Sequence, residues 1–137
     1  MEFLYSPFFG FDVKTHTAKL VGTKDTSISF TPLKAVGEYV AESINNPISK
    51  NAVISVAGET KTYGEIIEAV EKKTGQKWNV TYTPISEVQA KIDANPNKLE
   101  TVIDQLLVLF GKSQGIIKKP QNKEFGNVKP AKLVESL

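Results

Sequence analysis

The order of apolar and polar residues along the chain predicts short strands that alternate with helices. Strands are expected at residues 18–21, 27–30, 52–56 and 78–82, where apolar residues cluster or alternate with polar ones. The stretch 52–56 is nearly continuously apolar, which is typical of a strand buried on both faces of a sheet. A turn at residues 22–25 joins the first two strands, and Gly58 with Glu59 forms a turn after the third.

Helix start and stop signals predict four helices between and after the strands. The start signals are Thr31 with Pro32, Thr62 with Glu65, Ser86 with Gln89, and Asn97 with Glu100. The first residue of each pair is expected at the N-cap, where its side-chain oxygen accepts a backbone N–H. The Thr62 and Ser86 pairs are expected to form capping boxes. The stop signals are Pro47, Gly75, Pro96 and Gly111.

The spacing of large apolar residues gives each long helix one face that we expect to lie against the core. These residues are Leu33, Val36, Val40 and Ile44 in the first helix, Ile66, Ile67 and Val70 in the second, and Leu99, Val102, Ile103, Leu106, Leu107 and Phe110 in the last. The alternation of strands with such helices predicts an α/β fold, or an α+β-like variant of it.

The composition changes after the last predicted helix. Residues 111–137 hold six lysines against two glutamates, with scattered glycines and prolines. We expect residues 1–110 to form the main folded region. Residues 111–137 are expected to be a lysine-rich, loop-rich extension with a short helical turn at its end.

Composition and charge exclude several classes of protein. The 137 residues, 40% of them hydrophobic and 23% charged, are typical of one globular domain rather than a disordered chain. No cysteine is present and His16 is the single histidine, so we expect no disulfide, no cysteine nucleophile and no metal site. All 17 basic residues are lysines and the formal net charge is +2, which argues against nucleic acid or a membrane surface as a partner.

No targeting signal is recognisable in the sequence. The first residues are acidic at the front and broken by Pro7, unlike a secretory signal peptide. No stretch reaches the roughly 18 apolar residues that are needed to span a bilayer. We therefore expect a soluble protein of the cytoplasm.

The motifs of a self-contained enzyme are also missing from the sequence. No glycine-rich dinucleotide or triphosphate loop is present, and none of the four tyrosines is followed four residues later by lysine. His16 lies in a polar run, where we interpret it as a loop residue rather than a catalytic base. We therefore expect no catalytic residue, no cofactor-binding residue and no metal ligand in this chain.

An aromatic segment near the start of the chain is the candidate binding site. Phe8, Phe9 and Phe11 surround Gly10, and Pro7 interrupts any regular helix or strand period. Aromatic residues on such a segment either fill the core or line an apolar ligand pocket. The residues alone leave both interpretations open.

Several short stretches occur in an order that resembles a known family. They are Ser29-Phe30-Thr31, Val36-Gly37 with Tyr39, Asn45-Asn46-Pro47, the apolar run 52–56, Thr62-Tyr63-Gly64-Glu65-Ile66, and Thr74-Gly75-Gln76-Lys77. In this order they resemble the C-terminal half of the NmrA-like and isoflavone-reductase-like proteins, a group of atypical short-chain dehydrogenases/reductases. The resemblance covers about residues 3–110, and Ala35 stands where the family usually has an aspartate.

This resemblance implies a fold and a binding role. The chain would be the C-terminal, substrate-binding portion of a Rossmann-type NAD(P)-binding fold. The family's glycine-rich loop and catalytic lysine lie in an N-terminal half that has no counterpart among these residues. NAD or NADP would therefore be bound by a complete family member and not by this chain alone. Phe8, Phe9, Gly10 and Phe11 would form one wall of a pocket for a small apolar or aromatic substrate.

Two functions of different class follow from the resemblance. In the first, the chain is the substrate-binding half of an NAD(P)-dependent oxidoreductase, not catalytic alone, whose other half is missing or encoded separately. In the second, it belongs to a dinucleotide-sensing regulator that binds a protein partner without catalysis. The sequence leaves the choice between enzyme and regulator open.

Overall fold

The computed structural model describes residues 9–96 and 98–135 of the chain. Its strands are β1 (Phe11–Asp12), β2 (Thr17–Val21), β3 (Ser27–Phe30), β4 (Glu59–Thr62) and β5 (Asn79–Thr83). Its α-helices are α1 (Leu33–Ile44), α2 (Tyr63–Thr74), α3 (Ile85–Ala94) and α4 (Glu100–Gly111), and short 3₁₀ helices are η3 (Pro47–Ser49), η4 (Asn122–Phe125) and η5 (Leu133–Glu135). No helix in this part of the chain is long and apolar enough to cross a membrane.

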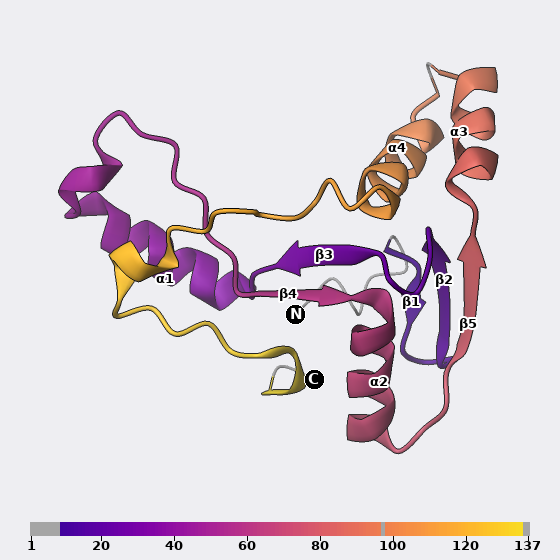
Figure 1. The fold of residues 1–137 in the computed structure, drawn as a ribbon, viewed down its shortest axis with the longest axis horizontal. Coiled ribbons are helices and arrows are strands. Elements are labelled where there is room, and N and C mark those ends of the chain that lie inside the picture. The colour runs from indigo at the N-terminus through magenta and orange to yellow at the C-terminus, as the bar shows by residue number, and fades with distance from the viewer. Residues whose placement is uncertain (1–8, 97, 136–137) are drawn as a thin grey trace.

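The strands form two small sheets. β2 pairs in parallel with β5, with Ala18 opposite Val80, and in antiparallel with β1. β3 and β4 form a separate antiparallel pair with Ser27 opposite Thr62. Figure 1 shows this pair in the middle of the molecule, with α1 at one end and α2, α3 and α4 gathered with the other three strands at the other end. The predicted mixed α/β class and the strands expected at 18–21, 27–30 and 78–82 are confirmed.

The largest core cluster lies between the two sheets and α2. Its buried members are Phe11, Ala18, Leu20, Ile28, Phe30, Tyr63, Ile66, Ile67, Val70, Trp78 and Leu133. A second cluster joins α3 and α4 to the end of β2, and a third lies between α1 and the η4 region. Burial of apolar surface is the main term that holds such clusters together.

Helix α2 follows the sequence signals closely. The Thr62 hydroxyl accepts the Glu65 N–H at 3.1 Å, and the Glu65 carboxylate accepts the Thr62 N–H at 2.7 Å, so the predicted capping box is formed. The helix ends at Gly75, whose φ of 68° is the left-handed conformation that glycine adopts without a steric cost. The predicted inward face of Ile66, Ile67 and Val70 is confirmed.

A carboxylate at the end of α2 fixes the turn into β5. Glu71 accepts the Trp78 N–H at 2.9 Å and pairs with Lys77 at 2.8 Å. The hydrogen bond from Lys77 is the main cause that lowers the pKa of Glu71, and the Trp78 N–H adds to it. Because the pKa in the folded state lies below that in the unfolded state, this carboxylate stabilises the fold above its ordinary pKa of 4.5 and loses that effect as the pH falls.

We expect the melting temperature of Glu71→Gln to lie below that of the wild type at pH 7 and to approach it as the pH falls toward 3. Thermal unfolding of both proteins across this range, followed by circular dichroism, measures the difference. A difference that stays constant with pH would show that the charge of Glu71 contributes nothing.

The apolar stretch 52–56 is not a strand, and this prediction is wrong. The Ser55 and Ala57 N–H groups donate to the side chains of Gln121 and Asn122 at 3.1 Å instead of to a neighbouring strand. Val53 is 91% exposed. The chain bends at Gly58 as predicted, but Glu59 already belongs to β4.

The predicted apolar face of α1 is also wrong. Leu33 and Ile44 are 68% and 78% exposed, and Val36 and Val40 are exposed as well. The buried side of this helix carries Ala35 and Tyr39, because the Tyr39 ring packs edge-on against Phe125 at a centroid distance of 5.8 Å. The helix therefore turns its small and aromatic side inward and its aliphatic side outward.

Two predicted helix caps are replaced by other interactions. Pro32 occupies the N-cap of α1, one residue later than expected, and the Thr31 hydroxyl accepts the Gly58 N–H at 3.0 Å instead. Pro84 occupies the N-cap of α3, so Ser86 lies inside the first turn and forms no capping box. Gln89 donates to Asp93 at 3.0 Å.

The last helix, α4, buries only part of its predicted apolar face. Asn97, its predicted cap, lies outside the described residues, and Leu99 occupies the N-cap without a side-chain hydrogen bond. Val108 is buried against α3, whereas Leu99, Val102 and Leu106 are exposed. Ile103, Leu107 and Phe110 are half-buried. The predicted inward stripe is therefore only partly correct.

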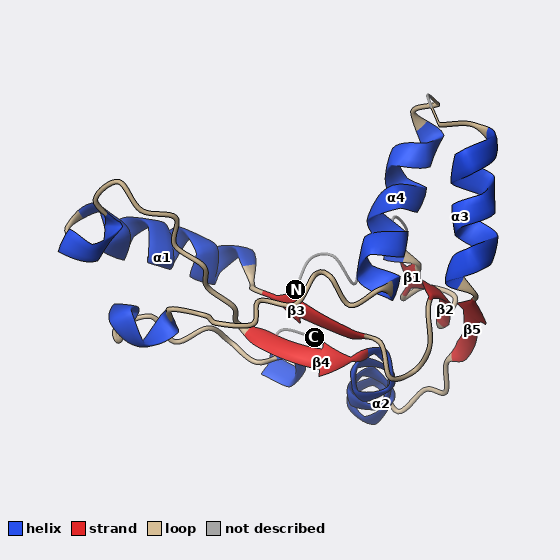
Figure 2. Cartoon of the chain, turned by 45° about the horizontal axis from the view of Figure 1, so that its top comes forward, coloured by secondary structure: helices blue, strands red, loops and turns tan. Residues whose placement is uncertain are grey.

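The segment after α4 runs past β3 to α1 and then turns back toward α2, as Figures 1 and 2 show. Phe125 and Val128 pack against α1, and Leu133 joins the largest core cluster. The Leu133 N–H donates to the Glu59 carboxylate at 2.9 Å. The chain beyond residue 111 thus supplies buried apolar side chains at both ends of the fold.

Candidate functional site

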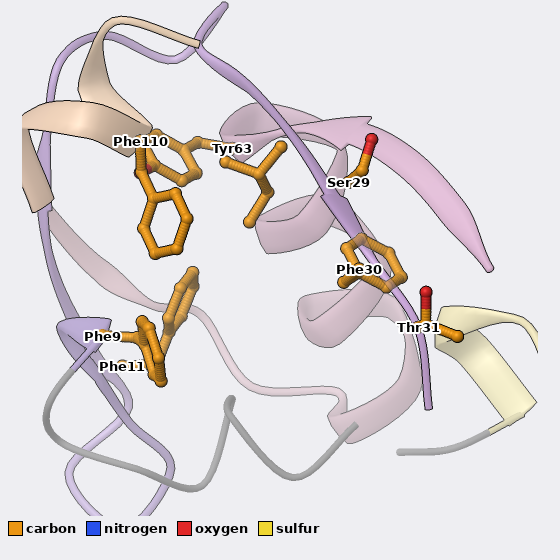
Figure 3. A pocket seen from close by; sticks show the side chains of 8 residues that line it. Phe9, Phe11, Ser29, Phe30, Thr31, Tyr63 and Phe110 are labelled. Carbon is orange, nitrogen blue, oxygen red and sulfur yellow. The ribbon is translucent and has the colours of Figure 1, made fainter. Parts of the chain in front are cut away.

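A cavity of about 230 Å³ lies beside β3, between the start of α2 and the end of α4. It is lined by Phe9, Phe11, Ile28, Ser29, Phe30, Thr31, Tyr63 and Phe110. Figure 3 shows Tyr63 and Phe110 side by side at one end, Phe9 and Phe11 below them, and Phe30 and Thr31 at the opposite end. The lining is mostly aromatic, and none of these described residues carries a charged side chain.

Three elements position the lining residues. Ile28 and Phe30 are two residues apart on β3, so both point to the same face of the strand. Tyr63 is the first residue of α2, and its backbone N–H donates to the Thr26 carbonyl at 2.9 Å. Phe110 lies in the last turn of α4 and packs against Phe9 at a centroid distance of 5.8 Å.

The structure brings two of the four predicted site residues into this cavity. Phe9 is half-buried and forms part of its wall. Phe11 also lines it but is only 1% exposed, and its ring packs edge-on against Trp78 at 6.4 Å. Phe8 lies outside the described residues. Phe11 therefore belongs to the core as well as to the cavity wall.

Gly10 serves the backbone rather than the cavity. Its φ is 82°, and its carbonyl accepts the Lys19 N–H at 2.7 Å. A Cβ at this position would collide with the Lys19 carbonyl oxygen. Glycine is required here because the chain passes very close to β2. Gly10 lines a separate, shallower groove that also includes Asp12, Lys19 and Leu107.

The chemistry of the cavity is that of binding rather than of proton transfer. Burial raises the pKa of the Tyr63 phenol to about 12, so the phenol stays protonated near neutral pH. His16 packs edge-on against Trp78 at 6.1 Å and is not among the lining residues. The described lining therefore offers apolar contact and neutral hydroxyls, but no general base at neutral pH.

Six lining residues were not predicted as site residues: Ile28, Ser29, Phe30, Thr31, Tyr63 and Phe110. Ile28, Phe30 and Phe110 have the spacing of core residues in the sequence, and Tyr63 is hidden inside a capping-box motif. No local signal separates such residues from ordinary core residues. They become a site only because β3, α2 and α4 meet beside Phe9.

Two described helices begin with a carboxylate in the first turn, which does not suit the pyrophosphate of a dinucleotide. Such a site needs free N–H groups and no negative charge at the start of a helix. Helices α2 and α3 carry Glu65 and Glu87 in their first turns. No step that involves NAD or NADP can be assigned to these residues.

Comparison with solved structures defines the class of the fold. The chain is similar over 98% of its length to a nucleoside-diphosphate-sugar epimerase from Staphylococcus aureus, with 14% identity and a TM-score of 0.64. It is similar over the same share to an NADPH-dependent quinone oxidoreductase from Escherichia coli, with 16% identity and a TM-score of 0.67. It covers 46% of the first chain and 50% of the second. The mixed α/β structure thus resembles part of the Rossmann-like epimerase and reductase folds.

Comparison of sequences identifies the family. A profile of the NmrA-like family matches residues 12–135, so the chain belongs to the NmrA-like family. An NmrA-like family domain-containing oxidoreductase from Gibberella moniliformis (strain M3125 / FGSC 7600) is 31% identical over 78 residues, which are 56% of this chain and 26% of that protein. The chain therefore spans half or less of the length of these relatives. The predicted family resemblance is confirmed at this level.

Proposed function

We propose that this chain is the C-terminal, substrate-binding region of an NmrA-like oxidoreductase, and that the cavity beside β3 receives a small apolar or aromatic substrate. The aromatic cavity carries this proposal. Phe9, Phe30 and Phe110 present ring faces and edges, which suit a planar apolar guest. A cavity of about 150 Å³ lined by apolar residues is large enough for benzene. A volume of about 230 Å³ therefore fits a compound with one ring and a short substituent.

The proposal assigns cofactor binding to other residues. In a complete family member NAD or NADP would be held by a nucleotide-binding half, and this chain alone would bind neither and would catalyse nothing. The starts of α2 and α3 support this division, because Glu65 and Glu87 place negative charge where a pyrophosphate would bind. The absence of cysteine from the sequence is compatible with a role in the cytoplasm.

Replacing Phe9 by alanine tests the cavity directly. We expect Phe9→Ala to weaken the binding of ethylbenzene about tenfold, because the phenyl ring loses its contact with the guest. Trp78 is the only tryptophan of the chain and contacts Phe11, so its fluorescence reports on a guest in the cavity. Leu106→Ala serves as the control, because Leu106 lies on the exposed side of α4 and does not line the cavity. The cavity proposal is abandoned if the wild type shows no saturable change or if both variants bind equally well.

A regulator that binds a protein partner is the second candidate function. The exposed aliphatic residues of α1 favour it, since soluble proteins rarely leave several large apolar side chains of one helix face in water. The two candidates differ in the surface that matters. The first depends on the cavity, and the second depends on Leu33, Val40 and Ile44.

A further inference from the structure

Residues 53–57 have the hydrogen-bonding pattern of a β-strand that is paired along one side only. The Ser55 carbonyl accepts the Gln121 N–H at 2.7 Å, and the Ser55 N–H donates to the Gln121 side chain at 3.1 Å. The Asn122 side chain bonds to both the N–H and the carbonyl of Ala57. Both backbone groups of every second residue thus point to the same side, as they do in a strand. Figure 1 shows this segment between α1 and β4, and it belongs to neither sheet.

The backbone groups on the opposite side of this segment are free. The N–H and carbonyl groups of Ile54 and Val56 form no hydrogen bond within residues 9–96 and 98–135. Because successive residues of a strand alternate, these groups point away from Gln121 and Asn122. Ile54 and Val56 are only half-buried and Val53 is 91% exposed, so the core does not enclose this edge. A free strand edge is a template for pairing with another strand.

The composition of the segment favours pairing with an identical segment. Free edges in monomeric proteins are usually protected by charged residues or proline, and residues 51–57 contain neither. A short, uncharged stretch of high β-propensity can therefore meet its own copy without like charges facing each other. In an antiparallel pair centred on Ser55, Ile54 of each copy lies opposite Val56 of the other. These two residues can then exchange both of their N–H···O bonds.

We propose that two copies of this chain associate through residues 53–57 into an antiparallel, two-fold symmetric dimer. The association closes at two copies, because Gln121 and Asn122 occupy the other edge of the segment and leave no place for a third. The dimer also accounts for a stretch that has the composition of a buried strand but no strand partner within one copy. It does not depend on the cavity, whose lining includes none of these residues.

Proline substitutions in the full chain test the edge. Val56→Pro removes an N–H of the free edge, whereas the matched control Val53→Pro removes an N–H that faces the other side. Sedimentation velocity at rising concentration should show a dimer for the wild type and for Val53→Pro. Val56→Pro should dimerise about 10- to 100-fold more weakly, because the same hydrogen bond is lost in both copies. Circular dichroism of the three proteins shows whether each is folded.

Amide hydrogen exchange of the wild type tests the same edge without a substitution. The N–H groups of Ile54 and Val56 should exchange slowly at concentrations where the dimer forms and quickly in the diluted monomer, whereas the Val53 N–H should exchange quickly in both. The proposal is overturned by a wild type that stays monomeric at every concentration, which would leave the edge to a strand of another protein. Aggregates that grow beyond two copies, or a dimer in which Ile54 and Val56 exchange as fast as in the monomer, also overturn it.

Discussion

Phe11→Ala is expected to lower the free energy of unfolding by about 3–5 kcal/mol, the loss typical of deleting a buried phenyl ring. Phe11 is enclosed by the largest core cluster and packs edge-on against Trp78. Its strand β1 is only two residues long, and Phe11 is the buried one of the two. Urea unfolding followed by circular dichroism measures the loss.

Phe9→Ala is the control for this result, because it removes the same ring at a position that is less buried. Phe9 is half-buried and borders the cavity, so the same substitution should cost about 1 kcal/mol and act mainly on ligand binding. The two phenylalanines were equivalent candidates for a pocket wall in the sequence, and the structure separates them. Equal losses of stability at both positions would mean that Phe9 is also a core residue.

The parts of the fold that local signals control could be predicted from the sequence. Helix α2 is the clearest case, because its caps involve only neighbouring residues. Thr62 and Glu65 form the capping box at its start, and Gly75 ends it in the left-handed conformation. Strands β2 and β5 were predicted because apolar residues cluster or alternate with polar ones within each segment, and this pattern is visible without knowing which strand pairs with it. Such signals depend on neighbours within a few residues.

The buried side of α1 and the conformation of residues 52–56 could not be predicted, because contacts with residues far away in the sequence determine both. The sequence of α1 offers an aliphatic side and a side with Tyr39, and Phe125 selects the second from more than 80 positions away. The stretch 52–56 has the composition of a buried strand, but Gln121 and Asn122 occupy its backbone groups. Periodicity identifies an apolar face without identifying what covers it.

The candidate site was predicted in part for the same reason. The irregular aromatic segment at Phe9 and Phe11 is visible in the sequence because no helix or strand period accounts for it. Tyr63 and Phe110 come to the cavity from other elements, and nothing local distinguishes them from core residues.

Leu133→Ala is expected to lower the free energy of unfolding by about 2–5 kcal/mol, although Leu133 lies within four residues of the end of the given sequence. Its side chain is 0% exposed in the largest core cluster, and its N–H holds the Glu59 carboxylate at the start of β4. The sequence predicted residues 111–137 to be a lysine-rich extension, and the division of the chain at residue 110 stays a prediction. A loss of this size would mean that the end of the segment is part of the cooperative unit.

The matched control for this prediction is Leu99→Ala, the same substitution at a position that is 86% exposed. Leu99 belongs to the stripe that the sequence predicted to be buried. Comparing the two variants therefore shows whether the loss of stability follows the burial seen in the structure or the helical periodicity of the sequence. Leu99→Ala should change stability by no more than about 0.5 kcal/mol, because no buried contact is lost. Urea unfolding of the two variants beside the wild type gives both values. A small loss of stability in Leu133→Ala would show that the core does not depend on the last segment. A large loss in Leu99→Ala would show that Leu99 is buried, as the sequence predicted for this face of α4.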